Sequence, residues 1–213
     1  MSNAININAH QLEVELTFTE ELLGTASSNP DLYRDYIASN ATDAATMEEE
    51  VAALGVDEVE RKEMTVFPRT EEGAPFLYDY QIKGFFKGAI GFLRGIPGTK
   101  ASKIRAYKKM VDGVIFPQPR VIPLILPEGE TLGTCQRPLR AQTMQGERIA
   151  LSNSETAPAG TRLHFEVLCM TKDAHGAVIE ALNYGRLHGM GQWRNSGKGR
   201  FTYDIIRDEV VEI

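Results

Sequence analysis

The sequence predicts an α+β fold, in which an antiparallel sheet carries helices on one of its faces. Alternation of apolar and polar residues marks half-buried strands at 12–18 and 161–170. Apolar residues at helical spacing mark helices at 80–95 and 174–189, each of which follows a strand-like segment. This order of strands and helices suits a ferredoxin-like or RRM-like antiparallel sheet with helices on one face and sizeable insertions.

Between the first strand and the first core helix, the chain is acidic and then strand-like. Residues 28–63 are interpreted as an acidic helical insertion with helices at 29–39 and 46–54, since helix start signals open both. Residues 63–79 are expected to form a strand, a Glu-Glu-Gly turn and a second strand. In the helix at 80–95, three glycines leave a smooth stripe for another backbone or a ligand, or for tight packing on the sheet.

The middle of the chain is basic and then rich in proline. Residues 96–113 are predicted to form a basic arm, a loop that leads into a short basic helix or an extended segment. The strand-like segment at 114–127 contains four prolines, which confine it to a sheet edge or an irregular ribbon. Residues 135–160 are expected to form a hairpin or a long excursion, and residues 201–213 a terminal strand.

Composition excludes several classes of protein. The chain has 213 residues, and its 42% of apolar residues is enough for a folded core, which argues against global disorder. It has no apolar run of the roughly 20 residues that a membrane span needs, and no secretory signal is visible. Its two cysteines, Cys135 and Cys169, cannot form a zinc site alone. A disulfide stays open, but a reduced cytoplasmic protein without membrane contact is the favoured interpretation.

Charge is unevenly distributed along the chain, whose formal net charge is −6. Residues 31–72 contain twelve acidic and four basic residues, whereas residues 81–120 contain nine basic residues and one acidic residue. Such polarity fits a surface that binds a polyanion. It also fits self-assembly, in which the acidic surface of one copy meets the basic surface of the next, or a solvated surface of uneven charge.

A basic glycine-rich loop, HGMGQWRNSGKGRF, occupies residues 188–201. It is not a Walker A loop, because five residues rather than four separate Gly191 from Gly197, and a glycine follows the lysine where Ser or Thr is required. It is not a dinucleotide-binding fingerprint either, because Arg194 stands in place of the third glycine. The glycines expected to let main-chain N–H groups approach phosphates are Gly189, Gly191, Gly197 and Gly199.

Three stretches, in this order, resemble the RAMP superfamily, the RRM-like proteins of CRISPR effector complexes. FLYDYQIKGFFKGAIGFL at 76–93 resembles the family's strand-to-helix pattern, in which a Lys-Gly pair leads into an apolar helix, although a phenylalanine replaces the family's small serine. NSETAPAGTRLHFEVLCM at 153–170 resembles a second family segment through Glu155, Pro158 and its Gly-Thr pair. The glycine-rich loop resembles the loop that follows the family's last helix. Together these stretches cover roughly half of the chain.

The resemblance implies a single RAMP-like domain over residues 1–213, with an RRM-like core that binds RNA or assembles side by side along it. The implied partners are single-stranded RNA, with single-stranded DNA as an alternative, and other copies of the chain or subunits of an effector complex. The chain also resembles proteins that a phage or another mobile element encodes. We expect neither a cofactor nor a metal ion.

The predicted nucleic-acid contacts combine the arm, the helix before it and the loop. Cations would neutralise phosphates, and Trp193 would stack on a base unless its indole is a core plug. The loop either belongs to this surface or is a structural clasp against the helix at 80–95. The predicted contact residues are Lys83, Lys87, Lys100, Lys103, Arg105, Lys108, Lys109, Trp193, Arg194, Lys198 and Arg200.

Two alternatives to non-catalytic RNA binding stay open. An endoribonuclease on the same fold would use His188 as a general base, or Asp112 together with a metal ion. A viral inhibitor would instead bind a protein partner and mimic an effector subunit, with the acidic segment at 40–63 in contact with a basic groove. No catalytic residue is assigned from sequence spacing.

Overall fold

The computed structural model describes residues 7–27, 64–143 and 146–213. Its helices and antiparallel strands confirm the predicted α+β class. The acidic insertion predicted at 28–63 lies outside the described residues. Among the residues that are described, no helix is both long enough and apolar enough to cross a membrane.

The larger sheet is built around β1 (Asn8–Phe18), which has an antiparallel neighbour on each side. These neighbours are β10 (Arg162–Cys169) and β11 (Phe201–Glu212), both of which were predicted as strands. β10 pairs in turn with β6 (Ile115–Gln118) and with β7 (Val121–Ile125). The proline-rich segment therefore does form sheet structure, as two short strands rather than one.

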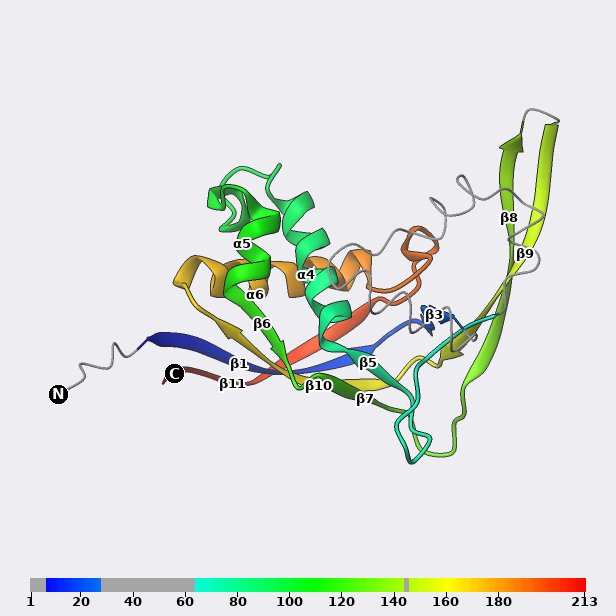
Figure 1. Ribbon diagram of the computed structural model, residues 1–213, viewed down its shortest axis with the longest axis horizontal. Helices are drawn as coiled ribbons and strands as arrows, with labels where there is room; N and C mark the ends of the chain where they lie inside the picture. The colour runs from blue at the N-terminus through cyan, green and yellow to red at the C-terminus, as the bar shows by residue number, and fades with distance from the viewer. Residues whose placement is uncertain (1–6, 28–63, 144–145) are drawn as a thin grey trace.

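Within residues 64–143 and 146–213, three helices accompany this sheet. β5 (Phe76–Tyr78) pairs with β7 at the edge and leads directly into α4 (Asp79–Leu93). α5 (Tyr107–Val114) precedes β6, and α6 (Lys172–His188) follows β10. All three lie on the same face of the sheet (Figure 1). The succession β1, α4, β6–β7, β10, α6, β11 is the βαββαβ arrangement of ferredoxin-like folds, as the sequence predicts.

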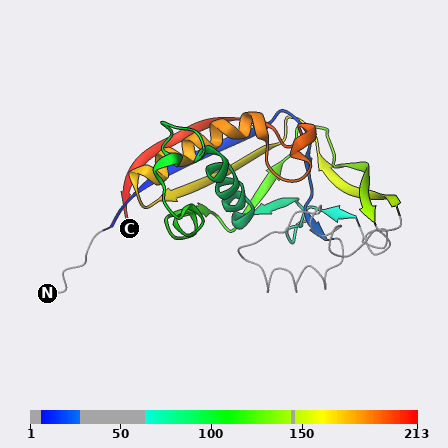
Figure 2. The same cartoon turned by 90° about the horizontal axis from the view of Figure 1, so that it is seen from above.

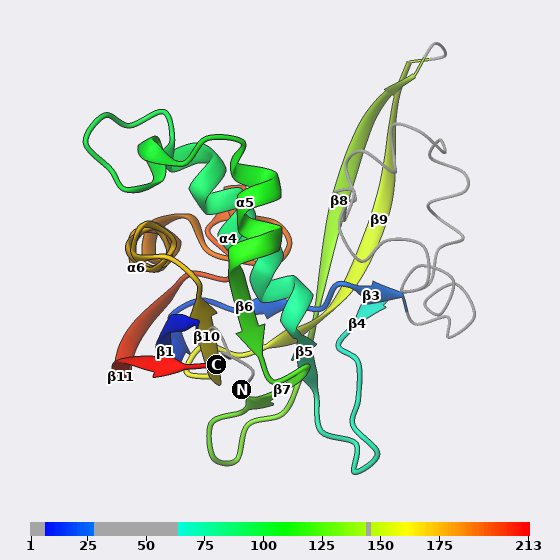
Figure 3. The ribbon, with the colours of Figure 1, turned by 60° about the vertical axis from the view of Figure 1, so that its left-hand side comes forward.

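A second, smaller sheet is dominated by the hairpin of β8 (Gly133–Thr143) and β9 (Gly146–Ala157), which confirms the hairpin predicted at 135–160. Three two-residue strands complete this sheet: β2 (Leu22–Leu23), β3 (Ala26–Ser27) and β4 (Thr65–Val66). The hairpin projects away from the helices and from the larger sheet (Figure 2, Figure 3).

The ends of the two long helices follow from the residues beside them. Thr171 is the N-cap of α6, and its Oγ1 accepts a hydrogen bond from the main-chain N–H of Ala174 at 3.1 Å. α6 ends at Gly189, whose φ of 76° favours glycine. At the start of α4, Oε1 of Gln81 accepts a hydrogen bond from the N–H of Tyr78 at 2.8 Å.

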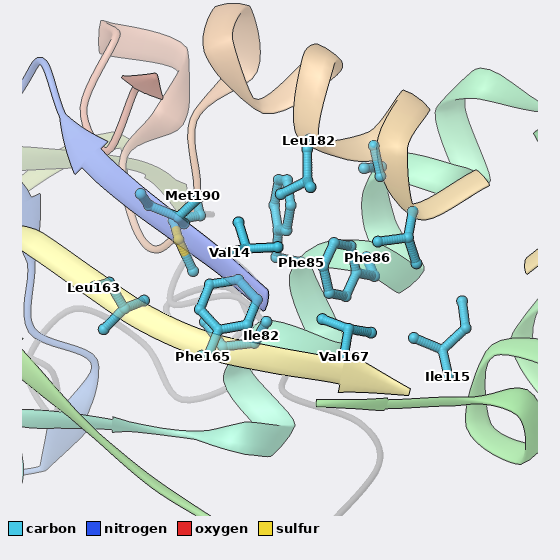
Figure 4. Packing of buried hydrophobic residues seen from close by; sticks show 14 of the residues in the cluster. Val14, Ile82, Phe85, Phe86, Ile115, Leu163, Phe165, Val167, Leu182 and Met190 are labelled. Atoms are coloured by element: carbon cyan, nitrogen blue, oxygen red, sulfur yellow. The ribbon is translucent and has the colours of Figure 1, made fainter. Parts of the chain in front are cut away.

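The hydrophobic core lies between the larger sheet and the helices, as Figure 4 shows. Val14 of β1 and Phe165 of β10 face Phe86 of α4 and Leu182 of α6. All four side chains are at most 1% exposed. Because burial of each such side chain stabilises the fold by about 1.5–3 kcal/mol, this layer fixes where the helices and their connecting loops lie.

Candidate nucleic-acid interface

The basic arm, residues 96–113, leaves the end of α4 and returns to the sheet through α5. It contains a 3₁₀ turn, η1 (Ala101–Lys103), ahead of α5, as the predicted loop and short helix require. Five predicted contact residues on it are exposed or half-buried: Lys100, Lys103, Arg105, Lys108 and Lys109. None of the five forms an ion pair with another described residue, so the arm presents its charge to solvent.

The arm is held in place by contacts with both long helices. The carboxylate of Glu180 on α6 accepts hydrogen bonds from the main-chain N–H groups of Lys100 (2.6 Å) and Ala101 (2.9 Å). The ring of Tyr107 lies against Gly91 on α4, where an added Cβ would come within 3.0 Å of the ring. One glycine of the predicted stripe therefore receives a side chain of the arm.

Lys83 and Lys87, the predicted contact residues on α4, are engaged by the end of the arm. Nζ of Lys83 donates to the main-chain oxygen of Asp112 at 2.9 Å and lies 4.7 Å from the centre of the Phe116 ring. Nζ of Lys87 lies 2.9 Å from the Asp112 carboxylate. Burial lowers the pKa of Lys83, while the Asp112 charge opposes this shift. Contact of these two lysines with nucleic acid stays a prediction.

The glycine-rich loop folds back on itself and on the segment that follows β1. Gly189 and Gly199 have left-handed φ values of 76° and 69°, and an added Cβ on Gly199 would collide with the main-chain oxygen of Met190. The N–H of Gly199 donates to the main-chain oxygen of Glu21 at 2.8 Å. The loop is therefore a clasp, but on the segment after β1 rather than on the helix at 80–95.

Two side chains of the loop contact other parts of the chain. Nζ of Lys198 donates a hydrogen bond of 2.6 Å to the carboxylate of Glu21, and this contact raises the pKa of Lys198. Trp193 has a left-handed φ of 54°, and the guanidinium of Arg137 lies 5.2 Å from the centre of its ring. A cation thus already covers one face of the indole.

The remaining loop residues lie closer to solvent. Arg200 is exposed and folds towards Gly197, where an added Cβ would come 3.5 Å from the guanidinium carbon. Arg194 is half-buried, and neither arginine has an ion pair within the described residues. At Gly191 an added Cβ would come 3.0 Å from the Leu22 side chain. Arg194 and Arg200 are therefore the loop cations best suited to a phosphate.

A cluster of three rings lies on the outer surface of the helices, and two of its members were not predicted from the sequence. Phe92, near the end of α4, is 60% exposed, and its ring lies 6.1 Å from Tyr184 and 5.5 Å from His188. Tyr184 and His188, one turn apart on α6, stack at 4.9 Å. Their i, i+4 spacing is visible in the sequence, whereas the approach of Phe92 depends on how the two helices pack.

His188 is the member of this ring cluster that carries a titratable imidazole. Burial lowers its pKa, and the positive charge of Arg194 lowers it further. Its Nε2 is buried and has no hydrogen-bond partner in the described part of the chain. Both effects favour the neutral form of the imidazole, which lies beside Phe92 and Tyr184.

The arm, the ring cluster and the loop share the helical side of the molecule. Figure 1 shows the arm near α5 and the loop at the far end of α6. The arm is attached at Glu180 and the loop begins after His188, so eight residues of α6, about 12 Å, separate them. Since stacked nucleotides are about 3.4 Å apart along one strand, this gap corresponds to about three or four nucleotides.

The opposite, helix-free face of the sheet is occupied by paired charges. Glu13 lies 2.9 Å from His164 and 3.3 Å from Arg207. Glu166 accepts hydrogen bonds from Arg207 and from Gln11. Because these carboxylates line the centre of that face and are bound to their neighbours, it is less suited to a polyanion than the helical side.

Cofactor and metal sites were predicted to be absent. In the described ranges, one group of histidine and carboxylate side chains has the spacing for a metal ion, namely His10, His175 and Asp208. It lies towards the start of α6, thirteen residues or about 20 Å from His188. It is therefore separate from the surface described above.

Comparison with known proteins supports the fold. No family model matches the sequence, and no curated protein matches it. Among solved structures, the chain is similar to one in the cryo-EM structure of the Type III-B Cmr-beta bound to cognate target RNA, with a TM-score of 0.55 and 11% identity. The similarity covers 97% of this chain but 61% of that one. At this identity it shows a shared fold, and RAMP membership stays an expectation.

Proposed function

We propose that the chain binds single-stranded RNA on its helical side, through the ring cluster, the arm and the loop. The observation that carries the proposal is the position of Phe92 between two cationic elements. Its side chain is 60% exposed, and its ring is stacked with Tyr184 and tilted against His188. Single-strand-binding surfaces combine such rings, which stack on bases, with cations that follow the phosphates. The fold adds support, since a chain of similar fold belongs to a structure that contains target RNA.

The predicted contact residues divide into two groups on this surface. The arm cations and the two loop arginines are placed to neutralise phosphates directly. Lys83, Lys87 and Lys198 already hold a partner within the chain, so we assign them mainly to positioning the arm and the loop. Trp193 offers one ring face beside Arg137 and extends the surface towards the hairpin.

The ring cluster provides the sharpest test. Phe92→Ala should weaken binding of a labelled single-stranded RNA, measured by fluorescence anisotropy, because each base–ring stack contributes about 1–3 kcal/mol, or roughly 5- to 150-fold. Ile206→Ala is a matched control, since Ile206 is 58% exposed on β11. Equal loss in both variants, or none in Phe92→Ala, would remove the ring cluster from the binding surface.

The cations are tested by the salt dependence of the same titration. Lys108→Gln with Lys109→Gln should lower the slope of log affinity against log salt by about 1.4, since each phosphate contact of a single strand contributes about 0.7. The control, Arg162→Gln with Arg207→Gln, removes two charges from the helix-free face and should leave the slope unchanged. Far-UV circular dichroism confirms that each variant is folded.

The same experiment separates the alternatives. Titration with single-stranded DNA of the same sequence measures any preference for RNA, and a gel of the recovered RNA detects cleavage. Shortened RNA that becomes intact with His188→Ala or Asp112→Ala would establish the endoribonuclease instead. Absence of binding to either strand at low salt would refute both nucleic-acid functions and leave the protein-binding inhibitor.

A further inference from the structure

Three side chains from distant parts of the sequence meet where α6 begins. His10 lies in β1, His175 in the first turns of α6, and Asp208 in β11. Nε2 of His175 lies 3.0 Å from Oδ1 of Asp208, and the two imidazole rings are 4.7 Å apart. One donor atom from each of the three residues lies within 4.8 Å of the others. To bind an ion at about 2.0–2.2 Å from each ligand, the side chains would have to rotate so that these donor atoms lie closer together.

An irregularity in the sheet places the carboxylate on this face. From Phe18 back to Val14, residues of β1 pair with β11 in simple alternation, but the register shifts between Glu13 and Val14. Beyond the shift Leu12, which is buried under the helices, lies opposite Asp208. If the register of Val14 with Ile205 continued without the shift, Arg207 would lie opposite Leu12 instead. β-Bulges re-aim side chains in this way and are frequent at functional sites.

The surroundings suit a metal ligand set better than a simple surface ion pair. The His175 side chain is 16% exposed, whereas Asp208 is 42% exposed and keeps the cluster open to solvent on one side. Cys169 lies directly opposite His10 in the β1–β10 pair and is fully buried, but its sulfur is not among the clustered donor atoms. Two imidazoles and one carboxylate are the donors that divalent transition metals, and zinc in particular, bind in proteins.

We propose that His10, His175 and Asp208 bind a divalent transition metal ion of the zinc class, with a fourth position open to water. The ion would join β1, β11 and the start of α6, at the opposite end of α6 from the ring cluster. This site is independent of RNA binding, and either can fail without the other. This proposal departs from the expectation from sequence that no metal is bound.

A second histidine–carboxylate pair in the chain serves as a control for this proposal. His164 and Glu13 form a second histidine–carboxylate pair, at 2.9 Å, on the helix-free face of the sheet. The two pairs have nearly the same length, but only the pair at the start of α6 has a second histidine within reach among the described residues. A difference in metal affinity between the two pairs therefore measures the contribution of the third ligand, His10.

The test is metal binding by the full chain after treatment with a chelator. Isothermal titration with Zn²⁺ should give one site per chain, and Co²⁺ should give visible d–d absorption of a site with nitrogen and oxygen ligands. His175→Gln and Asp208→Asn should each weaken Zn²⁺ by at least about 100-fold, since even loss of an outer partner costs about 10–100-fold. His164→Gln should bind Zn²⁺ like the unmodified chain.

Two outcomes would overturn the metal-binding proposal, and a thermal unfolding experiment gives independent support. Absence of stoichiometric Zn²⁺ binding by the folded, chelator-treated chain would overturn the proposal. So would equal Zn²⁺ affinity in His175→Gln, Asp208→Asn and His164→Gln, because the metal would then be bound elsewhere. A thermal unfolding midpoint that rises with Zn²⁺ in the unmodified chain and in His164→Gln, but not in Asp208→Asn, supports it without any measure of activity.

Discussion

At the scale of single residues, His188 shows how packing sets the chemistry of the ring cluster. Its imidazole stacks on Tyr184 and is tilted against Phe92, and the positive charge of Arg194 acts on it electrostatically. Burial and that charge both disfavour the protonated ring, so both lower the pKa of His188. A neutral ring stacks on its neighbours without the cost of desolvating a charge.

This shift predicts a dependence of stability on pH. A histidine whose folded-state pKa lies below its unfolded value of about 6.5 binds fewer protons in the folded state. It therefore lowers the free energy of unfolding as the pH falls from about 6.5 through the folded-state pKa, and has no effect above that window. In urea unfolding at about pH 7.5 and about pH 5, His188→Gln should lose less stability on acidification than the unmodified chain. An identical loss in both would show that His188 does not titrate this way.

At the scale of helices, three glycines with the same low helix propensity lie in very different surroundings. A Cβ added to Gly84 on α4 would meet no atom from the rest of the fold within 4 Å, whereas Gly91 receives the ring of Tyr107. Gly185 on α6 is buried, and a Cβ there would collide with the rings of Phe201 and Phe85. The first glycine leaves space free, and the other two create room for aromatic side chains.

Alanine substitutions should separate these roles. Gly84→Ala should raise the free energy of unfolding by about 0.5–1 kcal/mol, because it removes the entropic cost of glycine within a helix. Gly185→Ala should lower it by about 1–3 kcal/mol, because the added methyl group overpacks the core. Both are measured by urea unfolding followed by circular dichroism. If Gly185→Ala were as stable as Gly84→Ala, the close packing of α6 on β11 would be wrong.

Elements could be predicted from the sequence where local pattern decides the structure. The alternation in β1 and β10 and the helical spacing in α4 and α6 were enough to predict the βαββαβ order. The partner of the glycine-rich loop was not predictable, because Gly199 packs on Glu21, which is 178 residues away in sequence. The ring cluster depends on helix packing and the His10–His175–Asp208 group on a bulge, and neither leaves a local signal.

At the scale of the whole molecule, charge and shape are both asymmetric. The arm and loop cations lie on the helical side, while the helix-free face carries paired charges around Glu13 and Glu166. The β8–β9 hairpin projects from one end (Figure 1), and an isolated two-stranded ribbon gains little stability by itself. A projecting ribbon is stabilised most when a neighbouring copy packs against it. This fits the expectation that copies assemble side by side along RNA.

Assembly along RNA predicts that stoichiometry follows RNA length. Mass photometry with single-stranded RNAs of about 10, 20 and 40 nucleotides should show more copies per RNA as length increases, given site sizes of about 4–16 nucleotides. A hairpin shortened by joining Pro138 to Leu151, which are paired in register, through Asn-Gly should still bind the shortest RNA as one copy. On the longest RNA it should bind as separate copies with lower apparent affinity, because contacts between neighbours are lost. If the shortened chain fills long RNA as tightly as the intact chain, the hairpin has no part in assembly.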